Sequence, residues 1–424
     1  MPWKQVEPME ERIRMVMEVQ RREWPLAELC RRFGISRKTA YKWLARYAAE
    51  GLPGLRERSR RPQHCPHAIA LCWCQRIAEL RLRHPHWGPK KLLVLLGERY
   101  PASSLPAVST VGAILHRQGL TQPRRRRHRR QITPADQVSF PQSPNEVWAV
   151  DFKGWFRTRD GRPCYPLTVS DLFSRYILVV RALPQARYAA TRATFEKLFA
   201  AYGLPQRIRS DNGAPFASIG AGGLSRLSAW WVRLGIALEF ITPGHPEQNG
   251  SHERMHRTLQ HEAVRAPAAN GNAQQRRFNR WRDEFNLTRP HEALAMKRPA
   301  QLYQASPRSY PATLAEPVYP ADFTIRRVRH CGAIKWQGRQ RHIGEALAGE
   351  RVGLHEMEPG CYEVFFGRVF LGCLYNDDPG GIRSAVRRGV RTAQQMSAPG
   401  CPAAAGQPDP LLQTVGKVSP MSPV

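Results

Sequence analysis

The order of strand and helix patterns between residues 145 and 240 constrains the fold of this 424-residue chain more than any other feature. Three apolar, β-branched or aromatic runs come first, VWAVDFKGWF, CYPLTVSDL and RYILVVRAL, separated by the turns TRDGRP and FSR. They predict a three-stranded antiparallel meander. A helix (ATRATFEKLFAAYG), a short strand (QRIRSD), a second helix (LSRLSAWWVRLG) and a last strand (LEFI) follow. This order predicts a mixed sheet flanked by helices, as in a ribonuclease-H-like α/β core.

Three acidic residues lie where this topology brings distant segments together. Asp151 falls in the first strand, Asp211 at the carboxyl end of the fourth, and Glu253 on a helix opened by Asn249 and Gly250. The first and fourth strands are neighbours in such a core, so the two aspartates can share metal ions while the helix brings Glu253 over them. Mg²⁺ takes oxygen ligands and accepts phosphate oxygens, and two ions about 4 Å apart can promote displacement at phosphorus. The three carboxylates are therefore the predicted catalytic and metal-binding residues.

Each acid taken singly also fits an ordinary structural role. Asp151 can be a strand-end surface charge, Asp211 a turn residue in SDNG, and Glu253 a solvated helix residue. Their joint occurrence favours the metal site. A fourth acid, Asp171, is interpreted as a structural residue of the turn that follows its strand.

The composition indicates a polyanionic partner. The formal net charge is +31, and so much like charge repels itself unless a partner neutralises it; a merely basic surface is the alternative. Nine cysteines, an odd number at irregular spacings, argue against a disulfide framework. No apolar run approaches the roughly 20 residues that cross a bilayer, so we expect a cytoplasmic protein, nucleoid-associated when bound to DNA, with no membrane partner.

Two helical units precede the α/β region. In residues 24–47, Gly34 suits a left-handed turn between two helices, and Ser36 can cap the second helix. This pattern predicts a helix-turn-helix, with an ordinary antiparallel helix pair as the alternative. The residues expected to face DNA project from the opening turns of the second helix: Arg37, Lys38, Tyr41 and Lys42.

The second unit contains HPHWGPKKLLVLLGER and SLPAVSTVGAILHRQGL, and it predicts another helix-turn-helix whose last helix Ser109 and Thr110 can start. Between the units, HCPHAIALCWC matches no standard zinc finger, so apolar core cysteines are favoured over zinc. The run TQPRRRRHRR has no apolar periodicity and predicts a solvated linker that can also follow a phosphate backbone or enter a minor groove. Its expected DNA contacts are Arg124, Arg125, Arg126 and Arg127.

The motifs WAVDFKG, TVSDLFSRY, RSDNGAPF, HPEQNGSHERMHRTL and FNLTRPHEAL resemble those of bacterial insertion-sequence transposases with a retroviral-integrase-type core, the DDE recombinases. The resemblance extends to about Tyr375. It implies dependence on Mg²⁺ or Mn²⁺, cleavage at transposon ends, strand transfer into target DNA, and a catalytic triad of Asp151, Asp211 and Glu253. A homo-multimer on DNA is expected because two element ends must be held together.

One spacing departs from the family. Glu253 follows Asp211 by 42 positions, a few more than in the best-known integrases, and the excess is placed in the glycine-rich run FASIGAGGLSRLSAW. Glu247 therefore competes for the third ligand position, and Glu253 is favoured because Asn249 and Gly250 precede it in the family's arrangement. Residues expected to support DNA contact are Asn212, Arg254 and Arg257. The histidines around this helix, His245, His252, His256 and His261, are expected to face DNA or solvent.

After the core, short alternating runs between about residues 318 and 375 predict a small SH3-like β-barrel that contacts DNA or a partner, and a tail rich in Pro, Gly, Ala and Ser is expected to be disordered. The predicted domains are a helix-turn-helix unit (1–58), a second helical DNA-binding unit (59–120), the Arg-rich linker (121–144), the ribonuclease-H-like core (145–263), a helical extension and linker (264–311), the barrel (312–376) and the tail (377–424). The predicted function is transposition. Its rivals are a nuclease of the same fold that cuts without joining and a domesticated, non-catalytic DNA-binding regulator.

Overall fold

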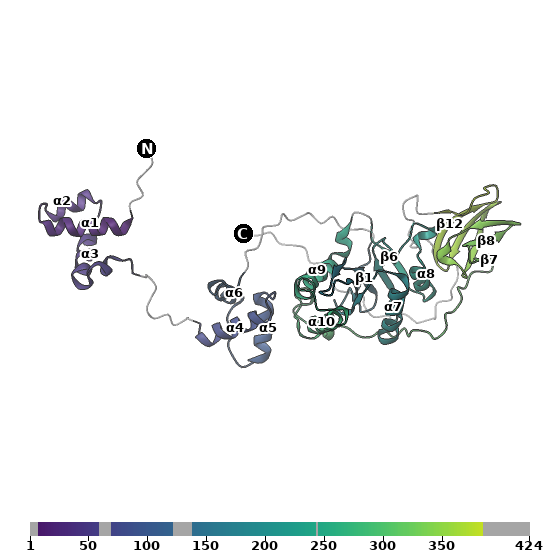
Figure 1. The fold of residues 1–424 in the computed structure, drawn as a ribbon, viewed down its shortest axis with the longest axis horizontal. Coiled ribbons are helices and arrows are strands. Elements are labelled where there is room, and N and C mark those ends of the chain that lie inside the picture. The colour runs from purple at the N-terminus through teal and green to yellow at the C-terminus, as the bar shows by residue number, and fades with distance from the viewer. Residues whose placement is uncertain (1–6, 59–68, 122–137, 243–244, 385–424) are drawn as a thin grey trace, which may run out of the picture. The chain divides into compact units, whose positions relative to one another are not determined.

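The structure, a computed structural model, describes residues 7–58, 69–121, 138–242 and 245–384 (Figure 1). The chain divides into two compact units, Met1–Trp73 and Cys74–Val424. No helix in the described ranges is long and apolar enough to cross a membrane.

The first unit contains the predicted helix-turn-helix. Gly34 adopts a left-handed conformation with φ of 62°, and the Ser36 hydroxyl accepts a hydrogen bond from the Thr39 N–H at 3.2 Å, so both the turn and the cap are confirmed. A helix that was not predicted comes before them and buries Met15 and Val16 against the pair. The elements are α1 (Pro8–Arg21), α2 (Leu26–Arg32), α3 (Arg37–Glu50) and η1 (Leu52–Leu55).

Three more helices follow, α4 (Leu71–Arg83), α5 (Pro89–Arg99) and α6 (Val108–Arg117). The expected cap of the last helix is wrong in detail. Ala107 occupies the cap position without a side-chain hydrogen bond, because Ser109 and Thr110 already lie inside the first helical turn. The buried residues of this unit are Trp87, Leu92, Leu96, Val111, Ile114 and Leu115.

The central sheet has the predicted mixed topology. Its path is β2–β3–β1–β5–β6, with β4 paired to β3. The β1, β3 and β4 strands are antiparallel, whereas β1, β5 and β6 are parallel. The elements are β1 (Val147–Phe152), β2 (Phe156–Arg157), β3 (Pro163–Asp171), β4 (Ile177–Leu183), α7 (Tyr188–Tyr202), β5 (Arg207–Ser210), η2 (Ala221–Gly223), α8 (Arg226–Arg233) and β6 (Ala237–Phe240).

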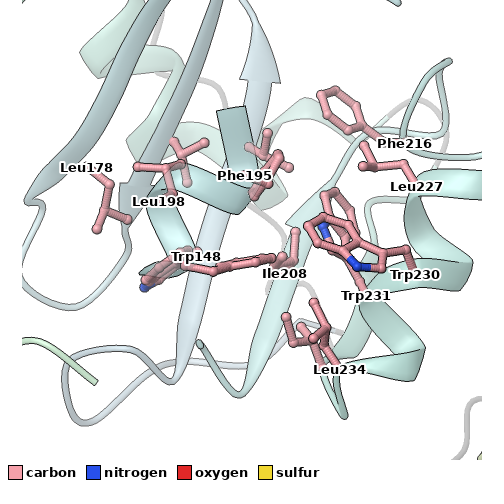
Figure 2. Packing of buried hydrophobic residues seen from close by; sticks show 14 of the residues in the cluster. Trp148, Leu178, Phe195, Leu198, Ile208, Phe216, Leu227, Trp230, Trp231 and Leu234 are labelled. Carbon is pink, nitrogen blue, oxygen red and sulfur yellow. The ribbon is translucent and has the colours of Figure 1, made fainter. Parts of the chain in front are cut away.

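Aromatic side chains fill the core between this sheet and α7 and α8 (Figure 2). Trp148 of β1 is fully buried, and its indole N–H donates to Asn145 Oδ1 at 3.0 Å. Phe195 of α7 meets Trp231 of α8 edge to face, with ring centroids 4.9 Å apart, a favoured geometry for aromatic pairs. The same cluster includes Ile208 of β5, so it holds β1, which carries Asp151, beside β5, which ends one residue before Asp211.

A second apolar cluster joins the sheet to the helices after β6. Ile177 and Val180 of β4 pack with Met255, Phe278 and Trp281. The elements are η3 (Pro246–Asn249), α9 (Gly250–Leu259), the π-helical turn η4 (Gln260–Val264), α10 (Gly271–Asp283), the π-helical turn η5 (Glu284–Thr288), η6 (Glu292–Leu294) and η7 (Pro299–Gln301).

The predicted C-terminal barrel is not closed. Its strands form a five-stranded sheet in the order β13–β12–β11–β10–β7 and a separate two-stranded sheet β8–β9, so β7 and β13 remain edges. The Arg341 guanidinium of β9 donates to the carbonyl oxygens of Asn376 and Gly380, a side-chain link where a barrel would need a backbone ladder. The elements are β7 (Thr324–Arg327), β8 (Ala333–Trp336), β9 (Arg339–His342), η8 (Glu345–Leu347), β10 (Arg351–Glu358), β11 (Cys361–Phe366), β12 (Val369–Tyr375) and β13 (Arg383–Ser384).

Pairing of β13 with β12 extends the sheet past residue 376, where the tail was predicted to begin. Most of the predicted tail, residues 385–424, lies outside the described residues.

The glycine-rich insertion before α8 connects the core to the C-terminal sheet. Ala221 and Leu224 belong to the same buried cluster as Leu371 and Leu374 of β12. Gly222 has a φ of 62°, and a Cβ there would lie 3.0 Å from Leu371 Cδ2. The insertion is therefore a packing loop, and it lengthens the interval between the second and third acids without interrupting β5 or α9.

Candidate active site

The strand register places Asp151 and Asp211 side by side. Ala149 pairs with Arg209 in the parallel β1–β5 ladder. Each aspartate lies two residues further along the chain, Asp151 inside β1 and Asp211 directly after the end of β5. Adjacent strands are about 4.8 Å apart, and residues two apart share a face. Burial, followed by the negative charges of Asp211 and, more weakly, Glu253, raises the pKa of Asp151 to about 7. The two carboxylates thus form an electrostatically strained pair.

One oxygen of the second aspartate lacks a partner. Within the described ranges, Asp211 Oδ1 is buried and accepts no hydrogen bond, while the Gly213 N–H bonds to the same carboxylate. Burial raises the pKa of Asp211 as well. A buried, unpaired carboxylate oxygen beside a second carboxylate is stabilised by a cation, so these donors fit a hard divalent metal ion.

The third acid lies on the predicted helix. Glu253 is in the first turn of α9, behind the N-cap residue Asn249, and its side chain is exposed. Among the residues described, no three Asp, Glu, His or Cys side chains converge into a finished metal-binding group. The fold therefore pairs the two aspartates and leaves Glu253 next to them. Its competitor Glu247 has backbone in the η3 turn, but its side chain lies outside the described residues.

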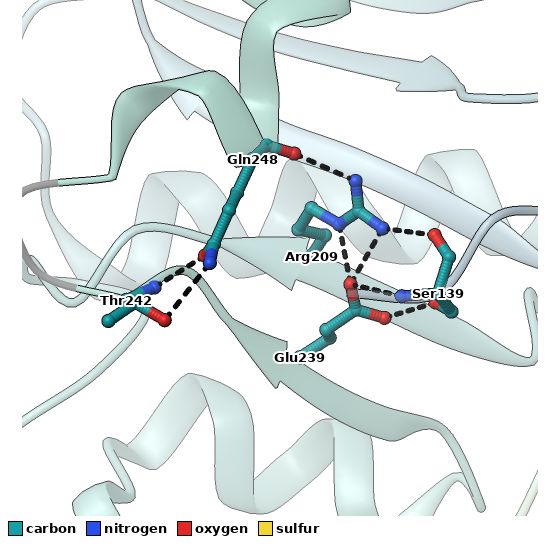
Figure 3. A network of polar contacts seen from close by, with 5 residues as sticks. All are labelled: Ser139, Arg209, Glu239, Thr242 and Gln248. Atoms are coloured by element: carbon teal, nitrogen blue, oxygen red, sulfur yellow. Dashed lines mark hydrogen bonds and ion pairs between the residues drawn. The ribbon is translucent and has the colours of Figure 1, made fainter. Parts of the chain in front are cut away.

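A buried ion pair between β5 and β6 is also hydrogen-bonded to the η3 turn directly before α9 (Figure 3). Arg209 and Glu239 are 2.6 Å apart, and their side chains are only 7% and 11% exposed. The same guanidinium donates to the carbonyl oxygens of Gln248 at 2.9 Å and Ser139 at 2.5 Å, and the Gln248 side chain in turn accepts from the Thr242 N–H at 2.7 Å. Arg209 precedes the second acid by two residues and Gln248 precedes the third by five, so this cluster couples their positions.

Two of the histidines expected at the surface are buried instead. His252 and His256 are 1% and 6% exposed, because α9 packs its inward face on β3 and residues four apart share a helix face. The Thr168 hydroxyl lies 2.8 Å from His252 Nε2 and 2.7 Å from His256 Nε2, and Ser170 Oγ lies 2.9 Å from His252 Nδ1.

Burial lowers the pKa of His252 to about 3. Burial and then the charge of His252 lower the pKa of His256 to about 2, so both rings are neutral. His256 Nδ1 lies 3.6 Å from Asp151 Oδ2, directly behind the first acid.

Sequence reasoning missed this polar cluster, although a signal exists. Thr168 and Ser170 alternate on one face of an otherwise apolar strand, and His252 and His256 are spaced by four on a helix. Polar residues two apart on a strand share one face of the sheet, and polar residues four apart on a helix share one face of the helix. Together they indicate that the strand and the helix pack against each other and satisfy each other's hydrogen bonds in a core.

Asp171 has the structural role that its turn suggested. It is fully buried and accepts hydrogen bonds from the N–H groups of Asn145 and Ser174 and from the Ser174 hydroxyl. Burial raises its pKa, and the three donors stabilise the carboxylate.

The predicted DNA-contacting residues are placed as follows. Asn212 is exposed, and its amide donates to the Ile241 carbonyl at 2.6 Å, which ties the loop after Asp211 to the end of β6. Exposed side chains on helices are those of Arg37, Lys38, Tyr41, Lys42, Arg254 and Arg257. The linker residues Arg124, Arg125, Arg126 and Arg127, and the candidate zinc ligands His64, Cys65 and His67, lie outside the described residues.

Family models match most of these regions. Residues 141–246 and 234–299 match two models of the integrase core domain. Residues 11–63 match a helix-turn-helix domain, and residues 39–115 match a homeodomain-like domain. These matches define a DNA-integration protein with an integrase-type core and N-terminal helix-turn-helix domains.

Residues 323–374 match the IS481 family transposase C-terminal domain, and the chain is similar to proteins of bacterial insertion elements. It is 26% identical over 296 residues to the insertion element IS476 uncharacterized 39.2 kDa protein of Xanthomonas euvesicatoria, covering 70% of this chain and 82% of that protein. It is 30% identical over 186 residues to the insertion element IS407 uncharacterized 31.7 kDa protein of Burkholderia multivorans, covering 43% of this chain and 64% of that protein, which is less than two thirds of its length.

Among solved structures, the HTLV-2 integrase catalytic core domain in complex with magnesium is 16% identical, with a TM-score of 0.31, over 38% of this chain and 99% of that chain.

Proposed function

We propose that this protein is a transposase that catalyses metal-dependent cleavage at the ends of its element and transfers the cut strands into target DNA. The observation that carries the proposal is the Asp151–Asp211 pair, whose carboxylates are partly buried, repel each other and include a buried oxygen without a donor. Such a pair on adjacent strands of an integrase-type core requires a cation for its ionised form.

Asp151, Asp211 and Glu253 would hold Mg²⁺ or Mn²⁺, in a two-ion arrangement. When bound, the ions supply activation of the attacking oxygen and stabilisation of the leaving oxygen. The protein itself positions the substrate: the exposed Arg254 and Arg257 follow Glu253 on α9 and are suited to contact phosphates on either side of the reacting one. Water or a 3′-hydroxyl attacks phosphorus directly, so no protein side chain forms a covalent intermediate.

The decisive experiment uses a labelled duplex that carries the DNA flanking the gene, a supercoiled target and Mg²⁺. Both a cleaved end and a joined product are expected. Cleavage without joining from a pre-cut end would instead make the protein a nuclease of the same fold, and binding without either product would make it a DNA-binding regulator.

Glu253→Gln is expected to reduce cleavage at least about a hundredfold, because loss of a residue that only hydrogen-bonds to a metal ligand already costs about 10- to 100-fold. Glu247→Gln is expected to keep activity close to that of the wild type. Both variants remove one negative charge near the start of α9, so each serves as the control for the other. Gel-based cleavage rates measure the effect. Full activity of the Glu253 variant combined with loss of activity in the Glu247 variant would reverse the assignment of the third acid.

Recognition of the element ends is assigned to α3. A variant carrying Lys38→Gln and Lys42→Gln is expected to bind an end duplex about tenfold more weakly and with a shallower salt dependence, because each lost phosphate contact reduces the slope by about one. Fluorescence anisotropy at several salt concentrations measures both quantities. Arg14→Gln, an exposed change on α1, is the control, and equal weakening by that change would place recognition elsewhere.

A further inference from the structure

We infer that Thr168, His252 and His256 form a positioning clamp that sets the separation between Asp151 and Glu253, an inference that rests on the proposed metal-dependent function. Thr168 pairs with Asp151 across the antiparallel β1–β3 ladder, and its hydroxyl donates to the Asp151 carbonyl oxygen at 2.9 Å. The same hydroxyl meets both imidazoles of α9. One side chain therefore joins the strand that carries the first acid to the helix that carries the third.

The hydrogen-bond inventory of this hydroxyl is complete. A threonine hydroxyl offers one hydrogen and two lone pairs. The hydrogen goes to the Asp151 carbonyl, so both lone pairs must accept from ring N–H groups, and both histidines must carry their proton on Nε2. His252 Nδ1 is then an acceptor, which the Ser170 hydroxyl at 2.9 Å satisfies. A single arrangement of protons saturates the Thr168 hydroxyl, and it determines the tautomer of both rings.

The clamp acts on the third acid because of where the histidines lie. His252 precedes Glu253 directly, and His256 follows it within the next helical turn. Glu253 projects outward from α9 while both imidazoles point inward. Rotation or sliding of α9 on β3 would move Glu253 relative to Asp151, and either motion would break bonds to Thr168 in a site that water does not reach, which is costly.

This placement differs from ordinary core filling. Thr168 and both histidines are almost fully buried, and apolar residues would fill the same space without any need for matched partners. Hydrogen-bonded residues behind metal ligands commonly change metal affinity or activity by about 10- to 100-fold when they are removed. Here they would act on the geometry between two ligands, since none of the three is itself expected to touch the metal.

The test compares Thr168→Val, which keeps the shape but removes the hydroxyl, with Thr168→Ser, which keeps the hydroxyl. Mn²⁺ binding to the full-length protein is measured by electron paramagnetic resonance of the free ion, and hydrogen exchange of residues 250–259 is measured without metal. Thr168→Val is expected to weaken Mn²⁺ binding at least about tenfold and to accelerate exchange in α9, whereas Thr168→Ser stays within about threefold of the wild type.

Thr191→Val is the matched control. Thr191 of α7 is equally buried, and its hydroxyl also donates to a backbone carbonyl, that of Arg187 at 2.9 Å. The Thr191→Val variant is expected to lose about as much thermal stability as Thr168→Val but to keep the Mn²⁺ affinity of the wild type. If Thr168→Val does not fold, Ser170→Ala removes the hydrogen bond to His252 Nδ1 by a smaller change, and a several-fold loss of Mn²⁺ affinity is then expected.

The clamp would be overturned if folded Thr168→Val bound Mn²⁺ as tightly as the wild type. If Thr168→Val does not fold, the same result in Ser170→Ala would overturn it. So would an equal loss of affinity in Thr191→Val. A wild-type protein that neither binds Mn²⁺ nor cleaves DNA would refute the proposed function itself, a result that differs from failure of the clamp because it is seen before any variant is made.

Discussion

Asp211→Asn is expected to lower both cleavage and strand transfer by at least about a thousandfold, the scale of loss when a central catalytic group is removed. The asparagine amide keeps the size of the side chain but lacks the negative charge with which Asp211, beside Asp151, would bind a cation. Binding to the element ends is expected to stay within about twofold of the wild type, because the helix-turn-helix belongs to a separate compact unit. Cleavage assays and mobility shifts on the same end duplex measure the two effects.

Asp151→Asn is expected to lose activity as Asp211→Asn does. In addition, the Asp151→Asn protein is expected to be more stable than the wild type. The pKa of Asp151 is raised to about 7 by burial and then by Asp211, so between about pH 4 and 7 the folded protein retains a proton that the unfolded chain releases. The contribution of Asp151 to the free energy of unfolding of the metal-free protein therefore falls as pH rises through this window and is level above it. A rise in pKa from 3.8 to about 7 corresponds to about 4 kcal/mol at about 1.4 kcal/mol per pKa unit. Because the Asp151 side chain is 27% exposed and solvent screens its charge, removal of the charge is expected to raise the free energy of unfolding at pH 8 by about half of that, about 2 kcal/mol.

Urea unfolding in EDTA at pH 5 and pH 8 measures this difference. The free energy of unfolding of Asp151→Asn is expected to exceed that of the wild type by more at pH 8 than at pH 5. This comparison cancels the opposite pH dependence of the buried His252 and His256, whose lowered pKa values both proteins share. Equal stability of the two proteins at pH 8 would mean that the first two acids do not strain the metal-free fold.

The sequence predicted the parts of the site that depend on local pattern. Runs of apolar, β-branched and aromatic residues identified β1, β3 and β4. The position of Asp211 after a short strand placed it beside Asp151 once the strands were ordered. Gly34 and Ser36 are similarly local, since one residue's conformation defines the turn and one hydroxyl defines the cap. Apart from the order of the strands, which follows from the fold as a whole, each of these features depends on neighbours within a few positions in the chain.

Features that depend on distant partners were not predicted. His252 and His256 look like surface residues until Thr168 and Ser170, more than 80 positions earlier, supply the hydrogen bonds that permit their burial. Arg209 in a short strand gives no sign that Glu239, Gln248 and Ser139 surround it. Barrel closure likewise depends on long-range edge pairing, which the strand patterns of the C-terminal domain do not encode.

Arg209→Met is expected to destabilise the protein by about 3–5 kcal/mol, the cost of breaking one side of a buried ion pair. Its guanidinium is the partner of the Glu239 carboxylate, which would be left charged in a nearly water-free position. The Gln248 carbonyl would also lose its hydrogen bond from Arg209. That bond links β5 to the turn directly before α9. Chemical denaturation measures the change. Arg233→Met, which breaks the more exposed pair with Glu350, is the control and is expected to cost less without lowering the cleavage rate.

A double variant separates stability from positioning. Arg209→Met combined with Glu239→Leu removes both charges, and such replacements of buried pairs are often neutral or stabilising, so most of the lost free energy of unfolding is expected to return. Cleavage is expected to remain at least about tenfold below the wild type, because the bond from Arg209 to Gln248 is still absent and the start of α9 is no longer tied to the strand before Asp211. Recovery of both stability and activity would show that the ion pair supports the fold alone. Recovery of stability without activity would show that it also places the acids of the site.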